Sequence, residues 1–564
     1  MNNNFIFCYL SLRFGFTLEM ASLVRYFKNA GPERIPSDTV IPLYDRDDTY
    51  ANRNVAFEFT MRFDEVLDAD KLADALWRLI EKPGWRKLGA RMRMNVGAPA
   101  RIVAKSPLLT LQDQSRLEYH IPEQFTKERP PINFTQFKYD MPLAEHPLGT
   151  ILPKATGKLE VFNVEEPLRE ALHQPKDVTR VLNDWITTDN AQLGLHVCTF
   201  KDATFITLTW IHTLLDAMGR SALLKAWIAV LEGREDDVPD FHGYDTDPLQ
   251  NLGASPSTLA ASGLSPKVEE SVLKSKQLGG LAMAKFVYNY MWEILFHPQE
   301  HGRIICMPAS YLSTLRVRCL KDLDTLDPSL LTTNSSTGRP FLSDGDILCA
   351  WTTRLLARAN PTLLTASAAT RTMHVMNVFG MRDLLASASD GYAALLPPAK
   401  EGVYIANCAS AIASLFTMQD FLTLPLGHIA AHLRRDLSVQ GSRAQIEASQ
   451  RLARTNGAYA QGMFGTGDMV LAAFTNWTKA RLFEADFSAA IVTEAEGKGE
   501  RGRGRPVYIH PDANRGKGFS LRGAASCVGR DGEGNWWASV MVREEFGGEV
   551  ERLVREMEME MGEV

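Results

Sequence analysis

A histidine and an aspartate four residues apart, His212 and Asp216, are the residues whose types and spacing could do chemistry. They lie in the stretch TFITLTWIHTLLDAMGRSALLKAW, where an apolar run ends on the histidine. An imidazole with an ordinary pKa of about 6.5 is mostly neutral yet still basic near pH 7, so it can take a proton from a hydroxyl or an amine. The spacing alone is more typical of a partly buried histidine beside a helix cap.

The sequence around this pair predicts a strand followed by a helix. Alternate apolar residues of the predicted strand 204–211 share one face, and His212 is the next residue on that face. The segment after Asp216 has apolar residues at helical spacing and ends at Gly233, so Asp216 stands where an N-terminal cap belongs. We therefore expect His212 at a junction between strand and helix, where side chains often face a cleft.

Strand and helix patterns alternate along the rest of the chain. Ser343 and Asp346 form a capping signal at the start of a helical segment that stops before Pro361. Other runs follow strand or helix periodicity without any internal repeat, and this interleaving predicts an α/β fold. The predicted strands are 54–63, 193–200, 204–211 and 535–543, and the predicted helices include 68–81 and 343–360.

The composition changes after Arg234, where a segment rich in Asp, Pro, Gly and Ser has no sustained period. We interpret this segment as a crossover linker between two halves. The predicted organisation is an N-terminal extension over 1–19, a first half over 20–234, a linker over 235–275 and a second half over 276–564.

Bulk composition is that of a soluble globular protein. The 564 residues are 45% apolar and 23% charged, and the formal net charge of -6 points to neither nucleic acid nor an anionic membrane as a partner. The seven cysteines are odd in number and form no CxxC pair. Single buried thiols in a reducing compartment explain this best, so we expect a cytoplasmic protein, and the sequence predicts no metal site.

Two apolar stretches are weighed as membrane or targeting segments. Residues 1–20 lack a basic start and are interrupted by Arg13, so they predict neither a signal peptide nor a span, and Met20 is an alternative start to Met1. The second stretch, 278–296, is interrupted on one helical face. It predicts an amphipathic helix that buries its other face, with peripheral membrane contact left open. The interrupting residues are Lys285, Asn289 and Glu293.

Seven segments resemble motifs of the BAHD acyltransferases, and they occur in that family's order. HTLLDAMG resembles the HxxxD motif, and FTNWTKARLFEADFSAA resembles the stretch from a Ser/Thr-containing tryptophan motif to the DFGWG motif. The resemblance covers nearly the whole chain from about Met20, closest in style to the fungal branch. It implies an α/β fold of two similar chloramphenicol-acetyltransferase-like domains with the active-site channel between them. The other matching segments are 41–48, 72–94, 345–359, 377–385 and 401–412.

The resemblance also implies roles for single residues. His212 is expected to be the general base that takes the acceptor's proton during attack on the thioester, with no metal and no acyl-enzyme. Asp216 is expected to point away from the substrate and to pair with an arginine. Thr475 and Trp477 are the candidate donors to the tetrahedral intermediate, although a core tryptophan beside a turn threonine is the alternative.

Other matches concern support and coenzyme binding. Asp486 matches the DFGWG aspartate and Arg382 matches its arginine partner, while Asn407 lies in the YFGN-like segment as a further structural residue. Gly-Trp-Gly of the motif is replaced, which bears on local loop shape more than on activity. A basic loop follows that could meet the phosphates of CoA, a solvated loop being the alternative. The replacing residues are Ser488, Ala489 and Ala490, and the loop carries Arg501, Arg503 and Arg505.

The function that the resemblance implies is acyl-CoA-dependent O-acyl transfer, most simply from acetyl-CoA to a hydroxyl of a small hydrophobic secondary metabolite. Acyl-CoA is then a co-substrate, no cofactor is tightly bound, nucleic acid is no partner, and the chain acts as a monomer. The alternatives are a condensation-type domain that uses carrier-bound acyl groups and an inactive relative that binds an acyl ligand. The condensation motif has two consecutive histidines and Asp-Gly, whereas Ile211 precedes His212 and Ala217 follows Asp216 here.

Overall fold

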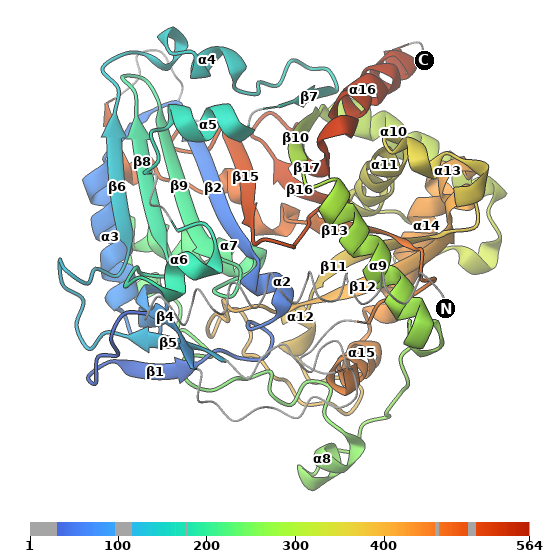
Figure 1. Cartoon of the computed structure of the whole chain (residues 1–564), viewed down its shortest axis with the longest axis horizontal. Helices are drawn as coiled ribbons and strands as arrows, with labels where there is room; N and C mark the ends of the chain where they lie inside the picture. Colours follow the sequence, from blue (N-terminus) through green and yellow to red (C-terminus); the bar gives the residue numbers. More distant parts are fainter. Residues whose placement is uncertain are drawn as a thin grey trace, which may run out of the picture.

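The computed structural model describes most of the chain and places its elements around two large β-sheets that lie side by side (Figure 1). The expected N-terminal extension, both candidate starts and Arg501 lie outside the described residues. Helices and strands alternate throughout, so the predicted α/β class is confirmed. The described residues are 31–95, 116–163, 165–175, 179–334, 336–456, 462–493 and 503–562.

The first sheet has five strands, and β9, the strand that leads to His212, lies at its centre. Every residue of β9 is buried because both faces of a central strand are covered. Helices α3 and α7 pack together on one face, and the Trp227 indole of α7 donates to the Leu72 carbonyl of α3. The strand order is β15 (Tyr508–Arg515), β2 (Val55–Phe63), β9 (Thr204–Ile211), β8 (Gly194–Thr199) and β6 (Asn133–Lys138), and the helices are α3 (Ala69–Glu81) and α7 (Ala217–Leu231).

The opposite face of the first sheet is covered by two short helices, α5 (Glu165–Ala171) and α6 (Leu182–Ile186) (Figure 1). There the buried carboxylate of Glu58 on β2 pairs with Arg169 and Arg180. Two small sheets complete this part of the molecule. They are β1 (Thr39–Pro42), β5 (Arg116–Ile121) and β4 (Arg91–Asn95), and β14 (Ile491–Thr493) with β3 (Val66–Leu67).

The second sheet has seven strands and a separate hydrophobic core under its helices. The capping box predicted at the start of α11 is present, since Ser343 Oγ accepts from the Asp346 amide and the Asp346 carboxylate accepts from the Ser343 amide. The strand order is β12 (Ala409–Thr417), β11 (Thr372–Gly380), β13 (Val470–Asn476), β16 (Ala524–Arg530), β17 (Trp536–Arg543), β10 (Glu300–Met307) and β7 (Glu160–Phe162). The helices that contribute to this core are α10 (Ala309–Asp322), α11 (Asp344–Arg358), α13 (Met418–Thr423), α14 (Leu426–Gln440) and α16 (Gly547–Gly562).

Each large sheet takes one edge strand from the other part of the chain. β15, which follows the second sheet's β13 in sequence, pairs with β2 of the first sheet, and β7 pairs with β10 of the second sheet. The division of the sequence at 235–275 stays a prediction. The remaining helices are α2 (Tyr50–Arg53), α4 (Leu148–Ile151), α8 (Pro256–Ala261), α9 (Gly280–Phe296), α12 (Arg382–Leu385) and α15 (Arg443–Asn456).

Helix α9 covers residues 280–296 of the apolar stretch 278–296, but the expectation that it buries its other face is wrong. None of its residues is buried, and Leu281 is 89% exposed. Ion pairs at its polar positions, Lys285 with Asp468 and Glu293 with Arg543, hold it against the surface in place of core packing. Within the described ranges no helix combines the length and the apolar character needed to cross a membrane.

Because β15 completes the first sheet, substitutions at two nearby residues should differ in their effect on the free energy of unfolding. Ile509 of β15 is completely buried in the core of the first sheet, whereas Val507, just before the strand, is 39% exposed. Ile509→Ala should lower the free energy of unfolding by about 2–5 kcal/mol because it leaves a cavity, and Val507→Ala should change it by about 0.5 kcal/mol or less. Urea unfolding measures both; equal losses would mean that β15 does not contribute to this core.

Candidate active site

His212 lies where β9 ends, between the two large sheets. Its amide donates to the Val55 carbonyl at 2.8 Å, and its own carbonyl accepts from the Asn407 side-chain amide at 2.9 Å. The ring packs against Phe57, with 5.1 Å between ring centroids. The first sheet therefore fixes one side of this residue, and the segment before β12 of the second sheet fixes the other.

The His212 ring is half-buried, and its Nδ1 atom has no hydrogen-bond partner in the described part of the chain. Burial lowers the pKa of His212 below its ordinary value, and the positive charge of Arg220 acts in the same direction. The negative charge of Asp216 acts against this lowering but does not reverse it. The ring is thus neutral at pH 7, which is the state that a general base needs.

The carboxylate of Asp216 makes five hydrogen bonds and belongs to the framework of the site. It caps α7 by accepting from the amides of Met218 and Gly219 at 3.1 and 2.9 Å. It also accepts two bonds from the Arg382 guanidinium at 2.8 and 2.9 Å and one from the Cys408 amide at 2.9 Å. One side chain thereby joins the helix after His212 to two segments of the second part of the chain.

The expected pairing of Arg382 with Asp486 is wrong, because Arg382 pairs with Asp216. Its remaining donors reach the carbonyls of Tyr404 and Ala406 at 2.7 Å. Burial alone would raise the pKa of Asp216, but the charge of Arg382 and the hydrogen bonds outweigh burial and hold that pKa below its ordinary value. The carboxylate therefore stays ionised, and Arg382 has its charge compensated inside the protein.

Asp47 is a further buried carboxylate at this site, and sequence reasoning missed it. Its Oδ1 accepts from both the backbone amide and the side-chain amide of Asn407 at 2.9 Å, which aims the Asn407 amide at the His212 carbonyl. Burial raises the pKa of Asp47 to about 7, with the nearby Lys87 acting against the rise. Its place inside IPLYDRDD, a segment that matches the family, was the available signal.

Thr475 and Trp477 follow one another at the end of β13, and the structure separates their roles. The Trp477 indole N–H, the single donor of that side chain, is bound to Thr475 Oγ1 at 3.0 Å. The Thr475 hydroxyl accepts this bond, so its own hydrogen remains available to donate. The Trp477 ring packs edge to face on Phe57, with 6.4 Å between centroids. Phe57 also contacts the His212 ring, so Thr475 and Trp477 lie near His212.

Asp486 and the basic loop have partners other than Arg382. Asp486 accepts from the Ser488 amide at 3.0 Å and from Arg505 at 3.3 Å, so Arg505 is held by a carboxylate. Phe487 is completely buried between Phe63 of the first sheet and Trp227 of α7. Arg503 is partly buried at the start of the described segment before β15. The DFGWG-like segment is therefore anchored in the first core by its phenylalanine.

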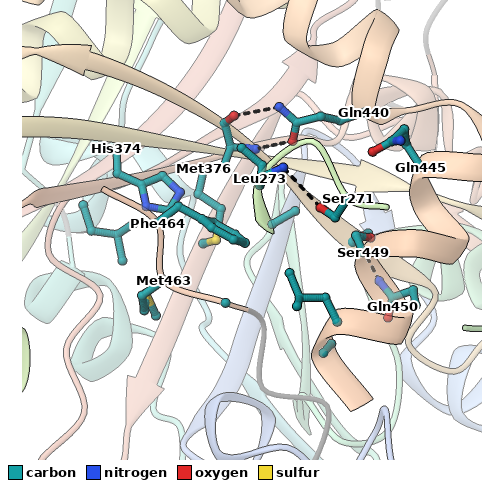
Figure 2. Close-up of a pocket in the computed structure, with 17 residues that line it drawn as sticks. Ser271, Leu273, His374, Met376, Gln440, Gln445, Ser449, Gln450, Met463 and Phe464 are labelled. Atoms are coloured by element: carbon teal, nitrogen blue, oxygen red, sulfur yellow. Dashed lines mark hydrogen bonds between the residues drawn. The ribbon is translucent and has the colours of Figure 1, made fainter. Parts of the chain in front are cut away.

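A pocket lies on the second sheet between β11, β12 and α15 (Figure 2). Most of its solvent-exposed lining is apolar. Burial lowers the pKa of His374 to about 4, and both ring nitrogens of this residue are without a partner in the described structure. Within the described residues no cluster of His, Cys, Asp and Glu could hold a metal ion. Residues that define the pocket include Leu273, His374, Met376, Gln450 and Phe464.

Comparison with known proteins adds relatives of nearly the same length. The chain is 31% identical to acetyltransferase adrJ of Penicillium rubens over 93% of this chain and 97% of the relative. It is also 31% identical to a protein of Penicillium decumbens named transcriptional regulator calD, over 95% of this chain and 99% of that relative. No family model matches the chain.

A solved structure shares the fold over almost the whole chain. The crystal structure of F. sporotrichioides TRI101 complexed with coenzyme A and T-2 covers 91% of this chain and 97% of its own, with a TM-score of 0.58. Sequence identity over this match is 15%, so the similarity concerns the fold.

Substitution of Asp216 should destabilise the protein, whereas substitution of Asp383, next to Arg382, should not. Asp216→Ala should lower the free energy of unfolding by about 3–5 kcal/mol, because it leaves the Arg382 charge buried without its partner and removes the cap of α7. Asp383→Ala, beside Arg382 but with an 89% exposed carboxylate, should change stability by about 0.5 kcal/mol or less. Urea unfolding of both variants makes the comparison, and a similar small effect in both would contradict the framework role.

Proposed function

The chain belongs to the BAHD-type acyltransferases and has their two-domain α/β fold, and from this premise we propose that it transfers an acyl group, most simply acetyl, from acyl-CoA to a hydroxyl of a small apolar secondary metabolite. The observation that carries the proposal is His212, a neutral and half-buried base at the junction of the sheets. The Asp216 carboxylate supports the segment that carries His212, and its hydrogen bonds go to Arg382 and to backbone amides.

In the proposed reaction the acceptor hydroxyl gives its proton to His212 while its oxygen attacks the thioester carbonyl. The tetrahedral oxyanion that forms accepts a hydrogen bond from the Thr475 hydroxyl, which Trp477 holds in place. Collapse of this intermediate breaks the carbon–sulfur bond, and the CoA thiolate takes the proton back from His212. The acyl ester and free CoA leave, and the base is again neutral.

The coenzyme part of the proposal has support from the relatives and the fold. The structure of TRI101, which has this fold, was solved with coenzyme A, and adrJ is named an acetyltransferase. We carry only the cofactor class and the transfer reaction to this chain. Arg503 and Arg505 belong to the proposal as candidate phosphate contacts, and Arg505 is bound to Asp486 in this structure.

The pocket of Figure 2 supports an apolar acceptor. Its lining residues Met376 and Ala413 lie level with Ala473 of β13 across the second sheet, so these three side chains share one face. Thr475 is two residues beyond Ala473 on the same strand and therefore lies on that face as well. A ring system in the pocket would thus be on the same side of the sheet as the proposed oxyanion donor.

The relative calD carries the name of a transcriptional regulator, and the same name is not proposed for this chain. Nucleic-acid binding depends on clustered positive charge that neutralises phosphates, and this chain has a net charge of -6. The features at the centre of the molecule instead suit proton transfer from an acceptor hydroxyl to a neutral imidazole.

The proposal predicts that His212→Ala loses about 10²–10⁴-fold in turnover while its melting temperature stays close to that of the wild type, because the ring serves proton transfer more than packing. Purified protein is incubated with acetyl-CoA and a panel of apolar alcohols, and free thiol and acetylated product are followed together. His301→Ala, a surface histidine beside Glu544, is the matched control and should keep full activity. Absence of thiol release with every acyl-CoA, or full activity of His212→Ala, would sink the proposal, and product formed only from carrier-bound acyl groups would favour a condensation reaction.

The protonation state of His212 predicts the acid side of the pH profile. Because the pKa of His212 is lowered in the folded protein, the base stays unprotonated until the pH falls below its ordinary value of about 6.5. Activity as kcat/KM should therefore be constant near pH 7 and fall only below about pH 6.5. Initial rates across pH 4.5–8 test this range, and an acid limb centred above pH 7 would be inconsistent with the buried, neutral base.

A further inference from the structure

Arg220 is a buried cation that the reaction described so far does not use. It lies on α7 one helical turn after Asp216, and only 1% of the residue is exposed. Its Nε and Nη2 atoms have no hydrogen-bond partner among the described residues. A buried guanidinium with unmade hydrogen bonds is costly, and an apolar side chain of similar volume would avoid the cost, so the charge calls for an explanation.

Three aromatic rings from three different elements surround this guanidinium. Its central carbon lies 4.0 Å from the centroid of Phe59 on β2, 4.4 Å from that of Trp477 and 5.9 Å from that of Trp210 on β9. At these distances the two close rings, Phe59 and Trp477, attract the guanidinium through cation–π interactions. Because Trp477 follows β13 of the second sheet, Arg220 attaches that residue to the first sheet.

Within the described ranges, the positive charge of Arg220 is not neutralised by an ion pair of its own. Asp216 is the carboxylate that acts on it from the same helix, but the hydrogen bonds of Asp216 go to Arg382 and to three backbone amides. The charged groups that act on His212 are this carboxylate and Arg220, with opposite effects. The base therefore lies in the opposing fields of one cation, Arg220, and one carboxylate, Asp216, whose hydrogen bonds are all made to other groups.

We propose that Arg220 is a positioning residue of the acyl transfer, which acts through two others: it holds the Trp477 ring and so the Thr475 hydroxyl, and it presents a positive charge to His212. The inference rests on the proposed function and extends it, since it makes HxxxDxxxR the working unit of this chain. Arg220 contacts neither substrate nor reacting atoms in this role. Its charge favours the unprotonated ring before attack and favours rapid return of the proton to the thiolate afterwards.

The test compares two neutral variants with a charged one in the full chain. Arg220→Met and Arg220→Gln should move the acid limb of kcat/KM to higher pH, because the ring becomes easier to protonate, and should lower kcat by about tenfold or more. Arg220→Lys should keep the limb at its wild-type position, since the charge remains. Lys225→Met, which removes a charge from the exposed side of the same helix, should leave both the limb and kcat unchanged.

A readout that needs no turnover keeps this proposal separate from the proposed function. NMR titration of labelled histidine reports the protonation of His212 directly, and it should show the same upward shift in Arg220→Met even if no acceptor has been found. An unchanged His212 titration in folded Arg220→Met or Arg220→Gln would overturn the proposal. Loss of folding in both neutral variants, as followed by thermal melting, would assign Arg220 to the fold alone and would overturn it as well.

Discussion

The rest of the structure depends on the hydrogen bonds and the ion pair of one buried carboxylate, Asp216. It ends the backbone turn after His212, starts α7, and binds the Arg382 guanidinium and the Cys408 amide from the other part of the chain. An ion pair of this kind adds little net stability over an apolar pair, but breaking it leaves an uncompensated charge in the interior. Its effect is therefore to fix one arrangement of the two sheets, the arrangement in which the second part of the chain reaches the carbonyl of His212.

This framework separates the carboxylates and the arginine of the site from His212, the proposed base. Asp216, Arg382 and Asp47 are fully engaged in holding backbone segments and Asn407. His212 is held through its backbone, so its ring keeps an unpartnered nitrogen and a lowered pKa. A base that is fixed by its main chain can exchange a proton without disturbing the contacts that position it.

The fold brings the parts of the site together by exchange between the sheets. β15 completes the first sheet, β7 completes the second, and Phe487 enters the first core from the DFGWG-like segment. Arg220 stacks on Trp477 across the same boundary. These contacts make the site a property of both parts of the chain, so neither sheet with its own helices holds the base, its framework and the proposed oxyanion donor together.

The sequence by itself determined the local elements, and it singled out His212 as the candidate base. Apolar alternation before His212 and the cap at Asp216 predicted β9 and α7, and Ser343 with Asp346 predicted the start of α11, because periodicity and capping depend on neighbours in the chain. The tertiary structure decided the partners. Arg382 lies 166 residues from Asp216, and only the packing of the two sheets shows that it binds this carboxylate and not Asp486. The roles of Asp47 and Arg220 and the exposure of α9 were likewise settled by long-range packing, since burial and charge compensation depend on what lies opposite in space.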